Sequence, residues 1–220
     1  LNNIAARAAR GDLLVFLNND TEILDAAWLR TLAAYALQPK TGAVGPKLLY
    51  PDRTVQHGGV IVGVHGIAGH AHLFLEADEG GYQGLATLTR EVAALTGACL
   101  AVTRVAYEAV GGMDETCQVA FNDILLCLDL IASGRTNVFV AAPLIIHHES
   151  KTRGLDNTPE KQRRARNEAR RAWKRHAALF RDDPFYSPNL SLETPYALAF
   201  APRRRVAWRP TSGVMPKIMM

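Results

Sequence analysis

One apolar run, at positions 13–17, lies between an alanine-rich segment and a polar cluster, and this order constrains the fold more than any other feature of the sequence. Residues 2–10 have a helical composition and end at Gly11, a residue that commonly stops helices. The apolar run has the length and composition of a buried strand. Directly after it comes a cluster of polar residues, Asn18-Asn19-Asp20-Thr21-Glu22. A helix, a buried strand and polar side chains at its carboxyl end predict an α/β domain with a ligand site at that edge.

The rest of the chain continues the alternation of helices and strands. Further helices are predicted for residues 25–38, 104–110, 121–133 and 158–180, and strands for residues 44–50, 54–62, 92–102 and 138–146, the last of which is interrupted by Pro143. Residues 63–84 are rich in Gly and His without periodicity, so we expect a long loop with solvated histidines. These patterns predict a mixed sheet flanked by helices over residues 1–183 and an extended tail over residues 184–220.

The composition excludes several classes of protein. Of the 220 residues, 48% are hydrophobic and 21% are charged, which is typical of globular proteins and not of disordered ones. No apolar run approaches the roughly 18 residues of a membrane span, so any membrane contact is expected to be peripheral. The three cysteines include no CxxC pair. Their odd number argues against a disulfide framework and a zinc ribbon, and favours the reducing cytoplasm.

Positive charge is concentrated in residues 161–181, where nine Lys and Arg side chains accompany one acid, Glu168. One alternative function is therefore a binding module that docks this helix on nucleic acid or on an anionic membrane. Against that reading, the basic positions surround a helix of this register, and no aromatic side chains alternate with them. We expect a solvated or anionic-surface face, and no nucleic-acid partner.

Acidic and imidazole side chains follow two predicted strands and open one predicted helix. Asp20 offers a hard oxygen and His147 a borderline nitrogen, a combination that suits Mn²⁺ or Mg²⁺ with phosphate oxygens completing the shell. Asp20 could instead bond nearby backbone in a turn. Asp123 lies in the first turn of a helix, where it is read either as a cap or as a general base. His147 and His148 are adjacent on a strand that can bury only one of them, so the other should face a site.

Taken together, these motifs resemble the family 2 glycosyltransferases with the GT-A fold, in their rhamnosyltransferase-like branch. Residues 9–22 resemble the "GD-strand-NNDTE" passage, residues 110–115 the VGGFDE turn, and residues 121–123 the acidic pair that opens the catalytic helix. Residues 147–154 resemble the HHESxSRG passage, and residues 183–191 the DPxYxPNLS tail. The matches follow in order over nearly the whole chain. The resemblance implies a GT-A domain that is truncated at its N-terminus and lacks its first strands.

The resemblance also implies an activity and a set of site residues. The activity is metal-dependent, inverting transfer of a hexosyl or rhamnosyl group from a nucleotide sugar to a hydroxyl of a glycan or lipid-linked acceptor. It implies Asp123 as the catalytic base, and Asp20 and His147 as ligands of Mn²⁺ or Mg²⁺. The other implied residues are, for the donor, Asn18, Asn19, Ser150, Lys151 and Arg153, and, for the acceptor side, Asn122, His57, Gly97 and His148. The enzyme would act in polysaccharide biosynthesis for the cell envelope, either free in the cytoplasm or at the inner face of the membrane.

Two positions depart from the family pattern in the predicted catalytic helix. Leu125 stands where the family has a second acid, and Asp129 stands where it has an arginine. These departures motivate a third reading, a catalytically silent relative. Should Asp123 not be the base, Glu115 or Asp114 in the preceding turn would be the next candidates.

Overall fold

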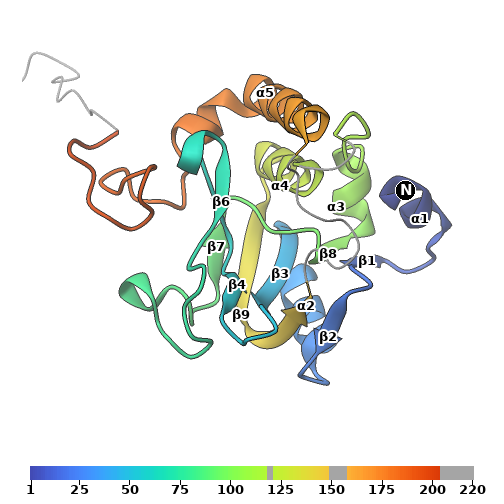
Figure 1. The fold of residues 1–220 in the computed structure, drawn as a ribbon. Coiled ribbons are helices and arrows are strands. Elements are labelled where there is room, and N and C mark those ends of the chain that lie inside the picture. Colours follow the sequence, from blue (N-terminus) through green and yellow to red (C-terminus); the bar gives the residue numbers. More distant parts are fainter. Residues whose placement is uncertain (118–120, 149–157, 204–220) are drawn as a thin grey trace, which may run out of the picture.

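A mixed sheet of seven strands forms the centre of the computed structural model, which describes residues 1–117, 121–148 and 158–203 (Figure 1). Five strands lie in the order β1-β8-β3-β9-β2, while β4 pairs with β3 and β7 pairs with β9. The strands are β1 (Leu13–Leu17), β2 (Thr21–Ile23), β3 (Thr41–Leu49), β4 (Val55–His57), β7 (Arg90–Val92), β8 (Cys99–Thr103) and β9 (Thr136–His147). The pair β3 and β9 is parallel and the other pairs are antiparallel. A separate hairpin joins β5 (Val60–Val62) to β6 (Ala68–His70).

Helices cover both faces of the sheet. On β8, Cys99 and Ala101 belong to the apolar cluster that contains α2 (Trp28–Ala36), while Leu100 and Val102 belong to the cluster with α3 and α4. Strand side chains alternate between faces, so one helix packs on one side and two on the other. These are α3 (Arg104–Ala109) and α4 (Asn122–Ala132), and α5 (Pro159–Arg181) lies on α4 as an outer layer (Figure 1). The predicted α/β fold with a mixed sheet between helices is confirmed.

The first helix, α1 (Asn2–Ala8), is fastened to α3 beside the edge strand β1. The guanidinium of Arg104 donates to the carbonyl oxygens of Ala6, Ala9 and Gly11. These bonds satisfy carbonyl groups at the C-terminal end of α1 that have no partner within the helix. The segment that leads into β1 is thereby held in place.

Two predicted strands are each divided in the structure. Residues 92–102 form two strands, because β7 pairs with β9 and β8 pairs with β1 and β3, so the chain must cross between them. Residues 54–62 are likewise divided into β4 and β5, at Gly59, whose φ of 94° is a conformation that glycine adopts readily. The predicted strand that Pro143 interrupts is observed as β9, and a register shift in its pairing with β3, between Pro46 and Lys47, accommodates the irregularity.

The region predicted as one long loop contains β6 and two short 3₁₀ helices, Val64–Gly66 and Tyr82–Gly84. His72 is 7% exposed, and the tail covers it: the ring of Tyr196 stacks on its imidazole at 4.4 Å, and the Tyr196 hydroxyl lies 2.9 Å from Nε2. The expectation of a solvated histidine is therefore wrong for His72. Desolvation lowers the pKa of His72 to about 4.

Asp183 fixes the start of the tail. Its carboxylate accepts the backbone N–H groups of Val62 and Phe185, at 3.0 and 2.8 Å. Burial raises the pKa of Asp183 to about 6.

None of the helices in the described ranges combines the length and the hydropathy that a bilayer span requires.

Candidate functional site

Asp20 and His147 lie together at the edge of the sheet. Strand β2 pairs antiparallel with β9, which places Thr21 opposite His147. The backbone N–H of His148 donates to the carbonyl of Asp20 at 2.8 Å. Through these pairings the turn after β1 reaches the end of β9. Oδ1 of Asp20 lies 3.2 Å from Nε2 of His147, and the two side chains are 15% and 11% exposed.

Gln56, on β4, holds the other side of the His147 ring. Its Oε1 lies 2.8 Å from Nδ1 of His147, and its Nε2 donates to the His147 carbonyl at 3.2 Å. An amide oxygen only accepts hydrogen bonds, so Nδ1 carries a proton in this contact, and Nε2 on the other side of the ring faces Oδ1 of Asp20 and the amide nitrogen of Asn18. Gln56 was not among the residues predicted from the sequence. Its position inside a predicted strand was the available signal, because burying an amide requires hydrogen-bond partners.

The contact between Asp20 and His147 is not a hydrogen bond. Oδ1 of Asp20 is buried and has no hydrogen-bond partner, although Nε2 lies within 3.2 Å. Two atoms that present lone pairs to each other need a cation or a proton between them. Two ligand atoms that each bind one cation at about 2.2 Å lie at most about 4.4 Å apart, so the observed separation fits a shared divalent ion. The donor set of one carboxylate and one imidazole fits Mn²⁺ or Mg²⁺.

Asn18 completes the polar cluster at this edge. Its side-chain nitrogen lies 3.2 Å from Nε2 of His147. Amide orientation is assigned from the hydrogen-bond network, so the reversed amide would present its oxygen to the same point. Within the described ranges, no third His, Cys, Asp or Glu joins Asp20 and His147 in a cluster that could hold a metal. Any further ligands must therefore be amide, water or substrate oxygens, or belong to residues outside those ranges.

Two backbone N–H groups hold the carboxylate of Asp123. The Ile124 N–H donates to Oδ1 at 2.8 Å within the first turn of α4, and the Gly97 N–H donates to Oδ2 at 2.7 Å. A Cβ at Gly97 would lie 3.4 Å from the Asp123 Cβ and 3.6 Å from Oδ2. The side chain of Asp123 is thus anchored to α4 and to the segment before β8, and Gly97 leaves space beside it.

Adjacent residues connect Asp123 to the Asp20 cluster. The backbone N–H of Asn18 donates to the Ala98 carbonyl at 2.9 Å, and the neighbouring residue, Gly97, bonds Asp123. Because β1 and β8 are paired in the sheet, this connection is rigid. The dipeptide Gly97-Ala98 therefore links the two parts of the site, because it bonds Asn18 of the Asp20 cluster and the candidate base, Asp123.

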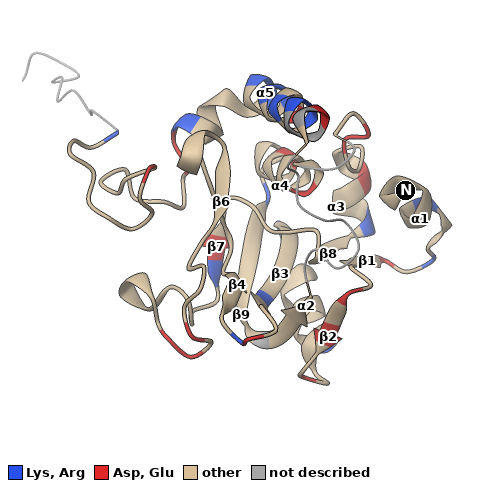
Figure 2. Ribbon diagram, in the orientation of Figure 1, with Lys and Arg blue, Asp and Glu red and all other residues tan. Residues whose placement is uncertain are grey.

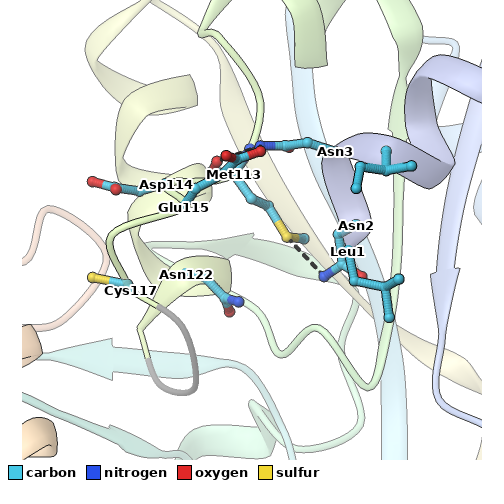
Figure 3. A pocket seen from close by; sticks show the side chains of 9 residues that line it. Leu1, Asn2, Asn3, Met113, Asp114, Glu115, Cys117 and Asn122 are labelled. Carbon is cyan, nitrogen blue, oxygen red and sulfur yellow. Dashed lines mark hydrogen bonds between the residues drawn. The ribbon is translucent and has the colours of Figure 1, made fainter.

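A cavity of about 530 Å³ adjoins the start of α4, between α1 and the turn at residues 113–117 (Figure 3). Asn2 lies on the α1 side, where its Nδ2 donates to Sδ of Met113, and Asn122 lies on the α4 side. The cavity is lined by Leu1, Asn2, Asn3, Ile4, Met113, Asp114, Glu115, Cys117 and Asn122. Amides and carboxylates of this kind can bind the hydroxyl groups of a sugar.

The remaining predicted residues differ in their accessibility. His57 is 1% exposed; its Nδ1 lies 2.8 Å from Nδ1 of His70, and burial lowers its pKa well below the usual value. His57 therefore has no surface with which to contact an acceptor, and that prediction is corrected.

The side chain of His148 is 27% exposed, and its Nε2 lies 3.3 Å from Oε2 of Glu22. Asn19 is exposed in the turn between β1 and β2. Three predicted donor residues, Ser150, Lys151 and Arg153, lie outside the described residues.

The two departures from the family pattern have structural roles. Leu125 is 1% exposed within the apolar core. Asp129 binds Arg175 and His176 of α5, each at 2.8 Å, and so docks that helix on α4. Neither residue contacts the carboxylate of Asp123.

The chain is similar to three curated proteins over most of its length. It is 42% identical over 207 residues to the uncharacterized protein y4gI of Sinorhizobium fredii, and 43% identical over 195 residues to the O-antigen biosynthesis protein RfbC of Myxococcus xanthus. These matches cover 92% and 87% of this chain but only 22% and 15% of those proteins. A third relative is the N-acetylglucosaminyl-diphospho-decaprenol L-rhamnosyltransferase of Mycobacterium tuberculosis, 27% identical over 66% of this chain and 50% of that protein.

The fold is shared with solved glycosyltransferases. GalNAc-T7, solved with UDP, GalNAc and Mn²⁺, matches 78% of this chain and 33% of its own with a TM-score of 0.58 and 15% identity. The mannosyltransferase PcManGT of Pyrobaculum calidifontis, solved with GDP-Man and Mn²⁺, matches 80% of this chain and 42% of its own with a TM-score of 0.50 and 14% identity. No family model matches the chain. The chain therefore has the GT-A fold of these solved structures, and its sequence is similar to the relatives named above, of which it spans only a part.

Proposed function

We propose that this domain catalyses metal-dependent, inverting transfer of a sugar from a nucleotide-sugar donor to a hydroxyl of a glycan or lipid-linked acceptor. The observation that carries the proposal is the 3.2 Å approach of Oδ1 of Asp20 to Nε2 of His147 without a hydrogen bond between them. The names of relatives support it. One relative acts in O-antigen biosynthesis and another is named as a rhamnosyltransferase for a diphospho-decaprenol acceptor. Two structural neighbours were solved with Mn²⁺ and a nucleotide or nucleotide sugar.

In this proposal Asp20 and His147 hold one divalent cation, Mn²⁺ or Mg²⁺, at the edge of the sheet. Such a cation, when bound, offsets the charge that develops on a departing nucleoside diphosphate. Asn18 and Asn19 contribute polar groups to the donor from the same turn. Ser150, Lys151 and Arg153 are proposed to contact the donor phosphates, because cationic side chains form strong hydrogen bonds with phosphate.

Asp123 is proposed to remove the proton of the acceptor hydroxyl. A sugar hydroxyl is a poor nucleophile until a general base takes its proton, and in inverting transfer it attacks the face of the sugar opposite to the leaving group. The backbone bonds from Gly97 and Ile124 fix the carboxylate for that task. Asn122 and His148 would contact other hydroxyl groups of the acceptor, and Gly97 would leave room for it.

The compartment is also part of the proposal. All three cysteines, Cys99, Cys117 and Cys127, are free and buried, which suits a reducing environment. Burial raises the pKa of the Cys99 thiol to about 12, so it is a packing group and not a nucleophile. We therefore propose action in the cytoplasm or at the inner face of the cell membrane.

The test is release of nucleoside diphosphate from a panel of UDP-, GDP- and dTDP-sugars, with and without Mn²⁺, in the presence of glycan acceptors. The proposal expects metal-dependent release that Asp20→Ala and Asp123→Asn abolish for different reasons, the first by weakening metal and donor binding and the second by slowing turnover. Proton NMR of the product should show an anomeric configuration opposite to that of the donor. Donor binding with Mn²⁺ but no turnover with any acceptor would support the catalytically silent reading instead.

A further inference from the structure

Lys and Arg residues are concentrated on α5 (Figure 2), and seven of them, at positions 163–175, divide into two sets by the contacts of their side chains. One set faces the domain. Arg171 donates to the Thr116 carbonyl at 2.9 Å, and Arg175 binds Asp114 and Asp129 at 3.1 and 2.8 Å. Arg164 lies 3.9 Å from Glu168. Arg171 and Arg175 hold the helix against α4 and the turn before it, while the contact of Arg164 lies within α5.

The second set points away from the domain. Arg163, Arg166, Arg170 and Lys174, which we call the outer row, are all exposed. At 3.6 residues per turn, they fall within an arc of about 80° on the side of α5 opposite to Ala172, which is fully buried. None of the four has an ion-pair partner among the described residues. The expectation that the basic residues surround the helix is therefore wrong for these four of the seven positions, since they form one stripe.

The shape of the outer row suits a flat anionic surface. From Arg163 to Lys174 the row extends over 12 residues, or about 17 Å at a rise of ~1.5 Å per residue, and it ends before the irregular backbone at His176. Nucleic-acid bases have no aromatic ring on the outer face of this helix on which to stack, because Trp173 packs against Phe180 and donates its indole N–H to the Gly66 carbonyl. A straight row of cations without aromatic side chains favours a lipid leaflet over nucleic acid.

We propose that the outer row of α5 docks this domain on a bilayer that contains anionic phospholipid. The inference rests on the proposed function, because a lipid-linked acceptor lies in a membrane that the enzyme must approach. Arg171 and Arg175 tie α5 to Thr116 and Asp114, which belong to the turn that lines the cavity beside Asn122. Docking through the outer row therefore brings the cavity near the leaflet from which the acceptor extends.

The experiment is co-sedimentation of the full chain with vesicles of phosphatidylcholine, with and without phosphatidylglycerol. The test variant is Arg163→Gln/Arg166→Gln/Arg170→Gln/Lys174→Gln. The control removes four exposed charges elsewhere, Arg10→Gln/Arg30→Gln/Lys40→Gln/Arg53→Gln. Each cation near an anionic leaflet contributes about fivefold to binding, so the outer-row variant should lose about a thousandfold in affinity for anionic vesicles. The control should lose far less, and raised salt should weaken wild-type binding.

Three results would overturn the proposal. The first is an equal loss of affinity for anionic vesicles in the outer-row variant and in the control variant, with unchanged circular dichroism spectra. This result would mean that binding depends on net charge alone. The second is wild-type binding to neutral vesicles as tight as to anionic ones. The third is tighter binding to duplex DNA than to anionic vesicles at the same salt, with the outer row responsible. Release of nucleoside diphosphate with a soluble acceptor should be unchanged in the outer-row variant, so failure of the glycosyltransferase proposal would be seen separately.

Discussion

Oε1 of Gln56 lies 2.8 Å from Nδ1 of His147, on the side of the imidazole away from Asp20. This bond fixes the orientation of the ring, so that Nε2 faces the carboxylate of Asp20. The carboxylate of Asp20 and the imidazole of His147 are thereby held in position to bind a cation before one is present. Gln56 is thus a positioning residue for the proposed metal site.

Replacing Gln56 should weaken metal binding without removing a ligand. We expect Gln56→Leu to bind Mn²⁺ about 10- to 100-fold more weakly, the usual effect of removing a partner that orients a ligating histidine. Isothermal titration calorimetry with Mn²⁺ measures the change. Gln56→Glu keeps an acceptor for the Nδ1 proton and should retain most of the affinity. Equal weakening in both variants would mean that Gln56 supports only the strand.

Asp123→Asn should slow turnover while leaving the donor bound. The asparagine can accept only one of the two backbone N–H bonds, so we expect a loss of stability of about 1–2 kcal/mol and a folded domain. Turnover should fall on the order of 10²-fold or more, the scale for a general base. Glu115→Gln is the matched control, since Glu115 accepts a bond from Asn3 in the adjoining turn. If Glu115→Gln abolishes turnover and Asp123→Asn does not, the base is Glu115.

Filling the space at Gly97 should affect activity more than stability. In Gly97→Ala the new methyl group meets Asp123 at 3.4 Å, an ordinary van der Waals contact, so the melting temperature should change little. The methyl group covers one side of the carboxylate, and we expect KM for the acceptor to rise and kcat to fall. Gly11→Ala, with a comparable contact to Leu13, is the control. Unchanged kinetics in Gly97→Ala would show that the acceptor approaches from another side.

Asp183 should make the domain less stable as the pH rises. Its folded pKa of about 6 lies above the ordinary value of 3.8, so its contribution is complete below about pH 4 and is lost as the pH rises through about 6. A difference of roughly two units corresponds to about 3 kcal/mol. The unfolding free energy of the wild type minus that of Asp183→Asn should therefore decrease by about this amount between these pH values. Denaturant titrations of the wild type and of Asp183→Asn across this pH range measure the decrease, and a difference that stays constant with pH would contradict it.

The sequence was sufficient for the elements that carry local signals. The apolar run of β1, the polar cluster after it and the periodicity of α4 are short-range patterns, and they predicted the approach of Asp20 to His147. Gln56 was missed because its role depends on β4 lying beside the end of β9, a long-range contact that periodicity does not report. His72 was misjudged for the same reason, since Tyr196 covers it from a tail more than a hundred residues away. The outer row of α5 became clear only when the buried face of that helix was known.

The central claim is that Asp20 and His147 share one divalent cation. The most direct measurement is a crystal structure of the chain grown with Mn²⁺ and a nucleoside diphosphate, with anomalous scattering collected at the manganese edge. The account predicts one strong anomalous peak within about 2.2 Å of both Oδ1 of Asp20 and Nε2 of His147, with diphosphate oxygens completing the shell. A peak bound by other residues, with Asp20 and His147 still 3.2 Å apart and unliganded, would contradict it.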